Sequence, residues 1–297
     1  MTERLASALE NDRLLVEKEI ERIYSGFGDK DTDTVREAEM YSLTAGGKRI
    51  RPFLVIEFCR LFGGSVDAAL PFAAAIEIMH TFSLIHDDLP CMDDDELRRG
   101  KPTSHVKFGE ATALLAGDSL SLRALETVLG NDKVSLGTAR LAALALARAA
   151  GSEGMIGGQI IDMRGEKEAL DFSTLLKLHA KKTGAIISVS AYLGCLAAGL
   201  PLSDPGFDSA RNYSENVGLA FQIVDDILDA TSDALTLGKN VGTDKKRNKT
   251  TFLSHMSLNA ANEYAERLTK DAVEAIKNIP GSGVLCDLAE YLLTRKT

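Results

Sequence analysis

The chain has 297 residues and a formal net charge of −9, because 43 Asp and Glu residues outnumber 34 Lys and Arg residues. A general nucleic-acid-binding protein is usually basic, so we set that class aside and expect no nucleic-acid partner. Apolar residues make up 45% of the chain, which is enough for a sizeable core. The length alone allows about two domains, but no linker-like segment divides the chain, so we predict one domain over residues 1–297.

Helical periodicity runs through nearly the whole chain, beginning with an apolar stripe of Leu5, Val16 and Ile20. Alternating strand patterns are absent. We therefore predict an all-α helical bundle whose functional sites lie between facing helices. The further helical patterns cover residues 47–64, 67–88, 110–129, 134–151, 173–199, 209–230 and 258–279, and a short C-terminal helix ends near Leu293.

The sequence contains no pattern that favours disulfides, export or membrane insertion. Its four cysteines are not paired at metal-ligand or redox spacing. The N-terminus is charged from its third residue and lacks the apolar core of a signal peptide. Residues 183–203 carry no charge and are about as long as a membrane span, but their serines and glycines favour a buried core helix. We expect a cytoplasmic protein with reduced thiols.

A first acidic cluster, DDLPCMDDDE, begins at Asp87 and holds six acidic residues in ten positions. His80 and Asp87 lie near one face of the preceding helix, and Asp88 lies one step round. Pro90 disturbs the helix, so Asp93 can fold back towards Asp87 and Asp88. The cluster is therefore more compact in space than an extended loop would make it.

Crowded carboxylates repel each other by about 1 kcal/mol per pair in water and about 4 kcal/mol at a partly buried site, for a separation of about 4 Å. In a cleft, the first cluster therefore needs cations. Mg²⁺ fits best if phosphate completes its oxygen shell. The alternative interpretation is a solvated acidic loop, in which the repulsion is small and easily screened by salt.

A second cluster, FQIVDDILD, lies near the end of the predicted helix 209–230. Its polar residues make one helical stripe, and an apolar stripe lies nearly opposite. A solvated face normally mixes Lys and Glu four residues apart, whereas this face offers only acids and an amide. The two clusters together therefore indicate facing walls of one cavity. The polar stripe is Gln222, Asp225, Asp226 and Asp229, and the apolar stripe is Val217, Phe221, Val224 and Leu228.

Four groups of basic residues accompany the two acidic clusters. Glycine turns with Lys and Arg suit phosphate, which Arg can bind through two parallel hydrogen bonds. We therefore predict up to two diphosphates, one held by metal and one by cations alone. Each group taken singly also fits a solvent-exposed loop, and we keep that interpretation for Lys181 and for 245–247. His179 and His255 are interpreted as surface or packing residues. The groups are 48–51, Arg98 with Arg99, 181–183, and 239–249.

These motifs, in this order, resemble the trans-isoprenyl diphosphate synthases, also called polyprenyl synthetases. The resemblance covers nearly the whole chain and is specific, because seven ordered motifs rarely coincide by chance. The motifs are GGKRIRP from Gly46, DDLPCMD from Asp87, RRG from Arg98, GGQ from Gly157, KTG from Lys182, DDILD from Asp225 and GKNVGTD from Gly238.

The resemblance implies a fold of the isoprenoid synthase type with a deep central cavity, and a homodimer. It also implies that Mg²⁺ joins an allylic diphosphate to the acidic motifs. The residues implied to bind the metal are Asp87, Asp93 and Asp225, with Asp88, Asp226 and Asp229 in or beside its shell. The allylic diphosphate would be held by Arg98, Lys182 and Lys239, and isopentenyl diphosphate by Lys48, Arg51, His80 and Arg99.

The implied reaction begins with ionisation of the allylic C–O bond, which metal and cations favour by stabilising the departing diphosphate. The isopentenyl double bond then attacks the allylic cation, which Thr183 and Gln222 would face. In the final step of the implied reaction, a proton is lost to the released diphosphate. Water must be excluded or it would capture the cation, and the loop 238–250 is a candidate lid.

Phe82 and Ser83 precede Asp87 by about one helical turn, so they should lie deeper along the cavity for the growing tail. An aromatic ring there, with the longer first motif, resembles the bacterial farnesyl diphosphate synthases. Geranylgeranyl synthases often have a smaller residue there, but the segment 90–105 also resembles theirs. We therefore favour farnesyl diphosphate as the product, with geranylgeranyl diphosphate as the alternative. Phe82 could instead be ordinary core packing.

Three further classes of protein fit the sequence less well. A class I terpene cyclase shares the first motif, but its second motif normally mixes Asn, Ser or Thr and Glu, and it has no use for GGKRxRP. A non-catalytic regulatory subunit of a prenyl synthase typically loses part of an acidic motif, whereas both are intact here. A metal-storage bundle would need Glu and His ligands on four helices, and that signature is missing.

Overall fold

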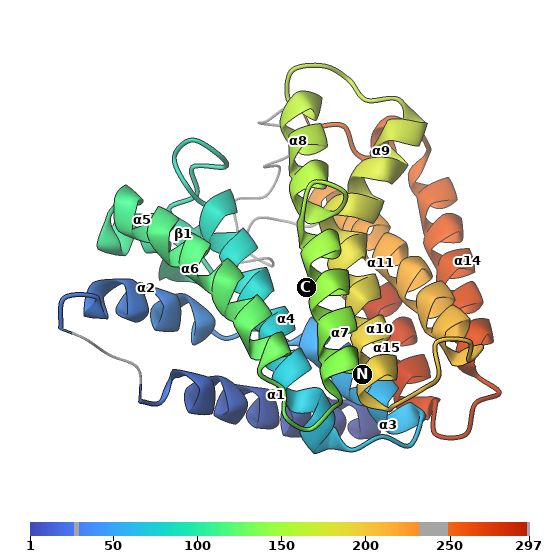
Figure 1. Ribbon diagram of the computed structural model, residues 1–297. Helices are drawn as coiled ribbons and strands as arrows, with labels where there is room; N and C mark the ends of the chain where they lie inside the picture. Colours follow the sequence, from blue (N-terminus) through green and yellow to red (C-terminus); the bar gives the residue numbers. More distant parts are fainter. Residues whose placement is uncertain (27–29, 232–248, 296–297) are drawn as a thin grey trace.

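The computed structural model describes residues 1–26, 30–231 and 249–295. Helices cover most of these residues and pack side by side (Figure 1). The helices are α1 Glu3–Tyr24, α2 Asp33–Leu43, α3 Ile50–Leu61, α4 Val66–Asp87, α5 Ser104–Phe108, α6 Glu110–Leu129, α7 Leu136–Ala150, α8 Met155–Gly165, α9 Phe172–His179, α10 Ala185–Ala197, α11 Gly206–Thr231, α14 Leu258–Ile276 and α15 Gly283–Thr294, with a π-helical turn η1 Ala180–Gly184 and a 3₁₀ turn η2 Phe252–Ser254.

The predicted all-α class is confirmed. Among the described residues the only strands are β1 Leu97–Arg98 and β2 Lys101–Pro102, two residues each, paired antiparallel. Their two-residue connection, Arg99 and Gly100, has φ values of 54° and 76°, which is the conformation favoured in tight hairpins. This hairpin presents two arginines beside the first acidic cluster.

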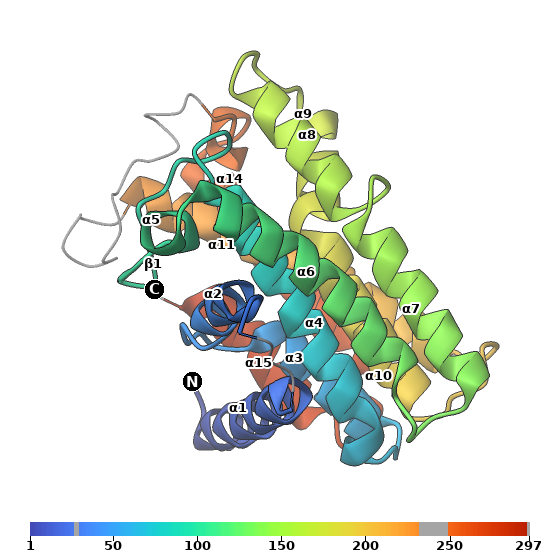
Figure 2. The ribbon, with the colours of Figure 1, turned by 60° about the vertical axis from the view of Figure 1, so that its left-hand side comes forward.

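Helix α4 is central to the bundle, where it packs against α3, α6 and α10 (Figures 1 and 2). It is long and apolar enough to cross a membrane by length and composition, but 78% of the apolar window is buried against other helices. The uncharged stretch 183–203, predicted to be a core helix, contains α10, most of whose residues are buried. Both segments are therefore core helices of the bundle.

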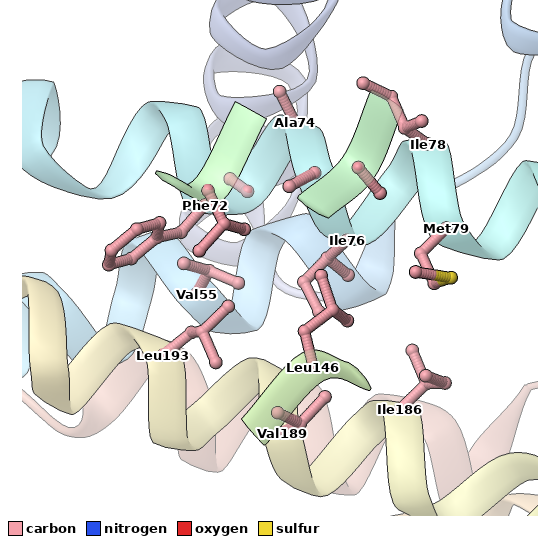
Figure 3. Packing of buried hydrophobic residues seen from close by; sticks show 14 of the residues in the cluster. Val55, Phe72, Ala74, Ile76, Ile78, Met79, Leu146, Ile186, Val189 and Leu193 are labelled. Atoms are coloured by element: carbon pink, nitrogen blue, oxygen red, sulfur yellow. The ribbon is translucent and has the colours of Figure 1, made fainter. Parts of the chain in front are cut away.

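The main core lies between α3, α4, α7 and α10. Figure 3 shows Val55, Phe72, Leu146 and Leu193 converging there, and each is fully shielded from solvent. Burying a side chain of this size contributes roughly 1.5–3 kcal/mol. Helices α3 and α10 approach closely at Gly194, where an added Cβ would lie 2.5 Å from the carbonyl oxygen of Val55. This packing fixes the position of α4, whose C-terminal end carries the first acidic motif.

Three helices, α2, α5 and α8, were not among the predicted helical segments. Helix α8 has Gly157 and Gly158 in its first turn, and glycine lowers helix propensity by about 1 kcal/mol relative to alanine. Its backbone is nonetheless held by packing against η1 and α9. The omission matters because α8 carries a residue of the site described next.

Candidate active site

The first acidic motif begins where α4 ends. The helix stops at Asp87, three residues before Pro90, and the chain then turns back so that the backbone N–H of Asp93 donates to the carbonyl oxygen of Asp87 at 2.8 Å. The predicted return of Asp93 towards Asp87 is therefore confirmed. The turn includes Asp94, whose φ of 52° is uncommon for a residue with a side chain.

Asp88 is buried and is held by Arg98 of the β1–β2 hairpin. The Nε of Arg98 donates to Oδ1 and Oδ2 of Asp88 at 2.9 and 3.1 Å, and Nη2 also donates to Oδ1. Asp88 has only 4% of its surface exposed, and a buried carboxylate needs such a partner. In this structure Arg98 therefore holds Asp88, and its predicted contact with a diphosphate stays a prediction.

Asp87 has an unusually high affinity for its proton. Burial, reinforced by the negative charges of Asp93 and Asp162, raises the pKa of Asp87 to about 6, although Lys182 and Arg98 act to lower it. A carboxylate so placed gains stability from any further cation that reaches it. The electrostatics of this motif therefore favour binding of a positive ion.

A residue that the sequence interpretation missed, Asp162 on α8, joins the KTG turn to the first motif. Lys182 Nζ lies 2.6 Å and Lys249 Nζ 3.0 Å from the same oxygen of Asp162, and Lys249 Nζ lies 3.8 Å from Asp93. Burial acts to raise the pKa of Asp162, but the two lysines outweigh it and hold that pKa below its usual value.

A signal for Asp162 was present in the sequence GGQIID. Gln159 and Asp162 are three residues apart and so lie on one helical face. Gly158 packs directly on the lysine turn, where an added Cβ would lie 2.3 Å from the backbone nitrogen of Lys182. The glycine pair therefore marks a close helix contact and not a loop.

The second acidic motif lies within the last turns of α11, and two of its carboxylates accept from distant parts of the chain. Asp225 pairs with Arg295 at 2.6 Å, and this arginine also lies over the ring of Phe221, 3.9 Å from its centroid. Asp226 accepts the backbone N–H of Phe252 at 2.7 Å. Asp229 is half-buried. Arg295 was not predicted as a site residue.

Gln222 lies one turn before Asp225, between two hydrogen-bond donors. Its Oε1 accepts the hydroxyl of Thr183 at 3.2 Å and lies 3.2 Å from Nδ1 of His179, while its Nε2 lies 3.4 Å from Asp225. The ring of His179 stacks on Phe252, so the packing interpretation holds. That interpretation missed the contact with Gln222.

The residues predicted to hold a second diphosphate come together at the start of α3. Arg51 Nη1 donates to Nε2 of His80 at 3.2 Å, so this nitrogen of His80 is an acceptor. Burial, more than the neighbouring arginines, lowers the pKa of His80 well below its usual value. Arg99 donates to the carbonyl oxygen of Gly46, and Lys48 is exposed.

Phe82 is 8% exposed and belongs to the main core cluster, where its ring meets that of His86 edge-on at 4.9 Å. Ser83 turns back to donate to the carbonyl oxygen of His80 at 2.8 Å. Phe82 thus has ordinary core contacts, and its predicted effect on product length stays a prediction. Lys239 and nearly all of the candidate lid 238–250 lie outside the described residues.

The described residues contain no group of three or more His, Cys, Asp or Glu side chains arranged to hold a metal ion by themselves. Mg²⁺ is usually bound by one or two carboxylates, with waters and substrate phosphate completing its shell. The donor set of Asp87, Asp93 and Asp225 fits that kind of binding, and the raised pKa of Asp87 agrees with it. These residues therefore fit magnesium brought in with a phosphorylated substrate.

Fold and site together define an all-α protein that gathers carboxylates, lysines and arginines between its helices, as in enzymes that act on diphosphates. The polyprenyl synthetase family model matches residues 32–280. The chain belongs to the polyprenyl synthetase family and is a short-chain trans-prenyl synthase, which confirms the resemblance noted in the sequence.

Curated relatives and solved structures agree on this family but differ in product. The farnesyl diphosphate synthase of Bacillus subtilis is 39% identical over 298 residues, with 99% of each chain covered. The heterodimeric geranylgeranyl pyrophosphate synthase large subunit 1 of Arabidopsis thaliana is 43% identical over 272 residues, which cover 88% of this chain and 72% of that protein. The apo structure of an FPP/GFPP synthase from Zymomonas mobilis superposes with a TM-score of 0.88 at 33% identity and covers 99% of this chain and 100% of that one.

Proposed function

We propose that the chain condenses isopentenyl diphosphate with an allylic diphosphate to give farnesyl diphosphate, acting as one domain over residues 1–297 in the cytoplasm. One observation carries the proposal. The short segment 249–252 contacts both acidic motifs, because Lys249 lies near Asp93 and the N–H of Phe252 donates to Asp226. Lys249 also shares Asp162 with Lys182. The two acidic motifs and the KTG turn are therefore connected through Lys249, Phe252 and Asp162.

The allylic diphosphate belongs at the acidic motifs. Asp87, Asp93 and Asp225 would hold Mg²⁺, which supplies positive charge to the leaving diphosphate when bound. Lys182, together with Arg98 and Lys239, would hold the diphosphate oxygens. Asp88 and Asp226 are held by Arg98 and Phe252, so their role is to orient the motifs beside the metal, as Asp229 would.

Isopentenyl diphosphate belongs at the second group of cations, Lys48, Arg51, His80 and Arg99. Arg51 supports this role because its Nε is buried and has no hydrogen-bond partner among the described residues, and such an atom favours an incoming acceptor. His80 stays neutral, so it accepts from Arg51 and keeps that guanidinium in place.

In the reaction, the allylic C–O bond breaks and the diphosphate leaves with the bonding electrons. The π electrons of the isopentenyl double bond form the new C–C bond at the cationic carbon. A proton is then lost to the released diphosphate, and a new double bond forms. The oxygens of Thr183 and Gln222 offer negative dipole ends to the cation, and pre-oriented dipoles of this kind stabilise developing charge without reorganisation.

The bulk of Phe82, one helical turn before Asp87, supports farnesyl diphosphate as the product. Geranylgeranyl diphosphate is the second candidate, favoured by the 43% identity to the Arabidopsis protein. Phe82→Ala should lengthen the product, while an unchanged product would limit Phe82 to core packing. A Phe-to-Ala change in a core also costs roughly 3–5 kcal/mol of stability, so Phe82→Leu serves as the milder control.

A homodimer completes the proposal. Apolar side chains lie exposed along α6, α7 and α8, which are neighbours in Figure 2. Leu122 is 69% exposed, Leu136 79% and Ile160 63%, and large apolar side chains left in solvent on neighbouring helices support burial in an interface. Sedimentation should give a dimer for the wild type and a smaller species for Leu122→Glu. A wild-type monomer would overturn this part of the proposal.

The experiment that tests the reaction is product analysis of the purified protein with Mg²⁺ and isopentenyl diphosphate. Dimethylallyl, geranyl and farnesyl diphosphate would be supplied in turn. A product that stops at farnesyl diphosphate is the expected result. Efficient extension of farnesyl to geranylgeranyl diphosphate would keep the reaction and replace the product. Absence of condensation with every primer would overturn the proposed function.

A further inference from the structure

His179 occupies a position that links three parts of the active site. It is the last residue of α9, directly before the π-helical turn η1 that carries Lys182 and Thr183. Its ring lies nearly parallel to that of Phe252, with 5.0 Å between centroids and 20° between planes. Its Nδ1 lies 3.2 Å from Oε1 of Gln222. Phe252 therefore covers one face of the ring, and the ring edge that carries Nδ1 points to Gln222.

The hydrogen bonds around Gln222 determine which nitrogen of His179 carries the proton. Gln222 Oε1 accepts the hydroxyl of Thr183, and its Nε2 points to Asp225. Because an amide oxygen can only accept, Nδ1 of His179 must donate. Nε2 of His179 then bears the lone pair, and this atom is buried without a hydrogen-bond partner among the described residues.

A buried acceptor without a partner costs about 1–3 kcal/mol. The opposite tautomer would leave Nε2–H without an acceptor and would also set the Nδ1 lone pair against the oxygen of Gln222. The Nδ1–H tautomer therefore leaves one nitrogen, Nε2, without a partner, whereas the Nε2–H tautomer leaves both ring nitrogens without a favourable contact. The Nδ1–H tautomer of His179 and this orientation of the Gln222 amide therefore favour each other.

We propose that His179 is a positioning residue that holds the amide of Gln222 in one orientation, with its oxygen on the Thr183 side and its NH₂ group on the Asp225 side. The inference rests on the proposed role of Gln222 beside the allylic cation. Without the second donor, the amide can turn over and present its NH₂ group, the positive end of its dipole, to the cation. The amide would then oppose the charge that the reaction develops.

The ring serves this role without adding charge of its own. Burial lowers the pKa of His179 to about 4, with the contact to Gln222 and the charge of Asp162 acting to raise it and Lys182 acting to lower it. The imidazole is therefore neutral at physiological pH. A neutral donor can orient Gln222 without repelling the nearby cation, which a lysine or arginine in the same place would do.

Two substitutions separate positioning from packing. His179→Phe keeps a ring against Phe252 but removes the donor, whereas His179→Asn keeps an N–H near the position of Nδ1 but removes the ring. We expect His179→Phe to lower kcat about tenfold, the value of roughly one hydrogen bond, with the KM of both substrates nearly unchanged. His179→Asn should lose no more than about threefold in kcat although its melting temperature falls further.

A double substitution tests whether His179 acts through Gln222. In the Gln222→Ala background, His179→Phe should cost less than about twofold in kcat, since residues that act as a unit are not additive. His255→Phe is the matched control. His255 packs on Phe172 and contacts the carbonyl oxygen of Leu170, and its replacement should leave kcat unchanged. A purely structural role for His179 would reverse the order, with Asn worse than Phe, and that order overturns the proposal.

A second measurement does not depend on turnover. In the metal-free protein with ¹⁵N-labelled histidine, the signal that His179→Asn removes should show the Nδ1–H tautomer. The Nε2–H tautomer would overturn the inference whatever the activity. If the wild type condenses no substrate, the proposed function fails, while the tautomer still decides whether His179 orients Gln222.

Discussion

The two acidic motifs differ in how the protein itself balances their charge. In the second motif, Asp225 and Asp226 accept from Arg295 and from the N–H of Phe252. In the first motif, Arg98 holds Asp88, but at Asp87 burial outweighs the nearby cations and raises the pKa to about 6. A metal ion arriving at Asp87 relieves an existing cost, whereas at Asp225 it competes with an arginine. Two motifs of similar sequence therefore have different electrostatic roles.

The largest expected effect is at the first motif. Asp87→Ala should lower kcat by at least about 10³-fold, because it removes a carboxylate proposed to hold the metal that stabilises the leaving diphosphate. The measurement is steady-state condensation with saturating Mg²⁺. The fold should survive, since the change removes a buried charge, and circular dichroism checks this. Activity within tenfold of wild type would contradict the metal role of Asp87.

The second-largest effect is expected at Lys249, the cation that joins the first motif to α8. Lys249→Met removes the ammonium that lies 3.0 Å from Asp162 and 3.8 Å from Asp93. We expect a loss of about 10²-fold in kcat/KM, the size typical of one charged contact to a transition state. Lys277→Met is the control, because Lys277 pairs with Glu274 on the surface. An equal effect of both changes would mean that Lys249 is not special.

The cost of holding a negative charge at Asp87 can be measured from the unfolding free energy of the metal-free protein. An acid whose pKa is raised in the folded state contributes stability at low pH, and this contribution is lost as pH rises through about 6. The gain in unfolding free energy of Asp87→Asn over wild type should therefore be larger at pH 7 than at pH 4, by about 2 kcal/mol. Denaturant melts at both pH values give this difference. A difference that does not change with pH would show that the charge of Asp87 does not destabilise the fold.

The smallest effect is expected at the second motif. Arg295→Gln removes the cation paired with Asp225, so Mg²⁺ with a non-hydrolysable allylic diphosphate should bind severalfold more tightly, since a competing ion pair of this kind is worth at most about 1 kcal/mol. Calorimetry measures the affinity, and Arg4→Gln, which breaks a surface pair with Asp287, is the control. Weaker binding would mean that Arg295 helps to hold the substrate.

Much of the fold could be predicted, because long apolar stripes specify helices locally. The fold-back of Asp93 could also be predicted, since Pro90 limits how far α4 can continue. Contacts between residues far apart in the sequence could not be predicted. Asp162 and Lys249 are 87 residues apart, and Asp225 and Arg295 are 70 apart. No local spacing determines such pairs, which exist only after α8 and α15 have packed.

The tight contact between Gly158 and the backbone of Lys182 has a consequence for how the enzyme tolerates change. Position 158 carries no functional group, yet any side chain there would displace the turn that aims Lys182 and Thr183, because even a Cβ would lie 2.3 Å from a backbone nitrogen. The position of Lys182 therefore depends on Gly158 having no Cβ. In a complete substitution scan, this glycine should be as intolerant as the aspartates.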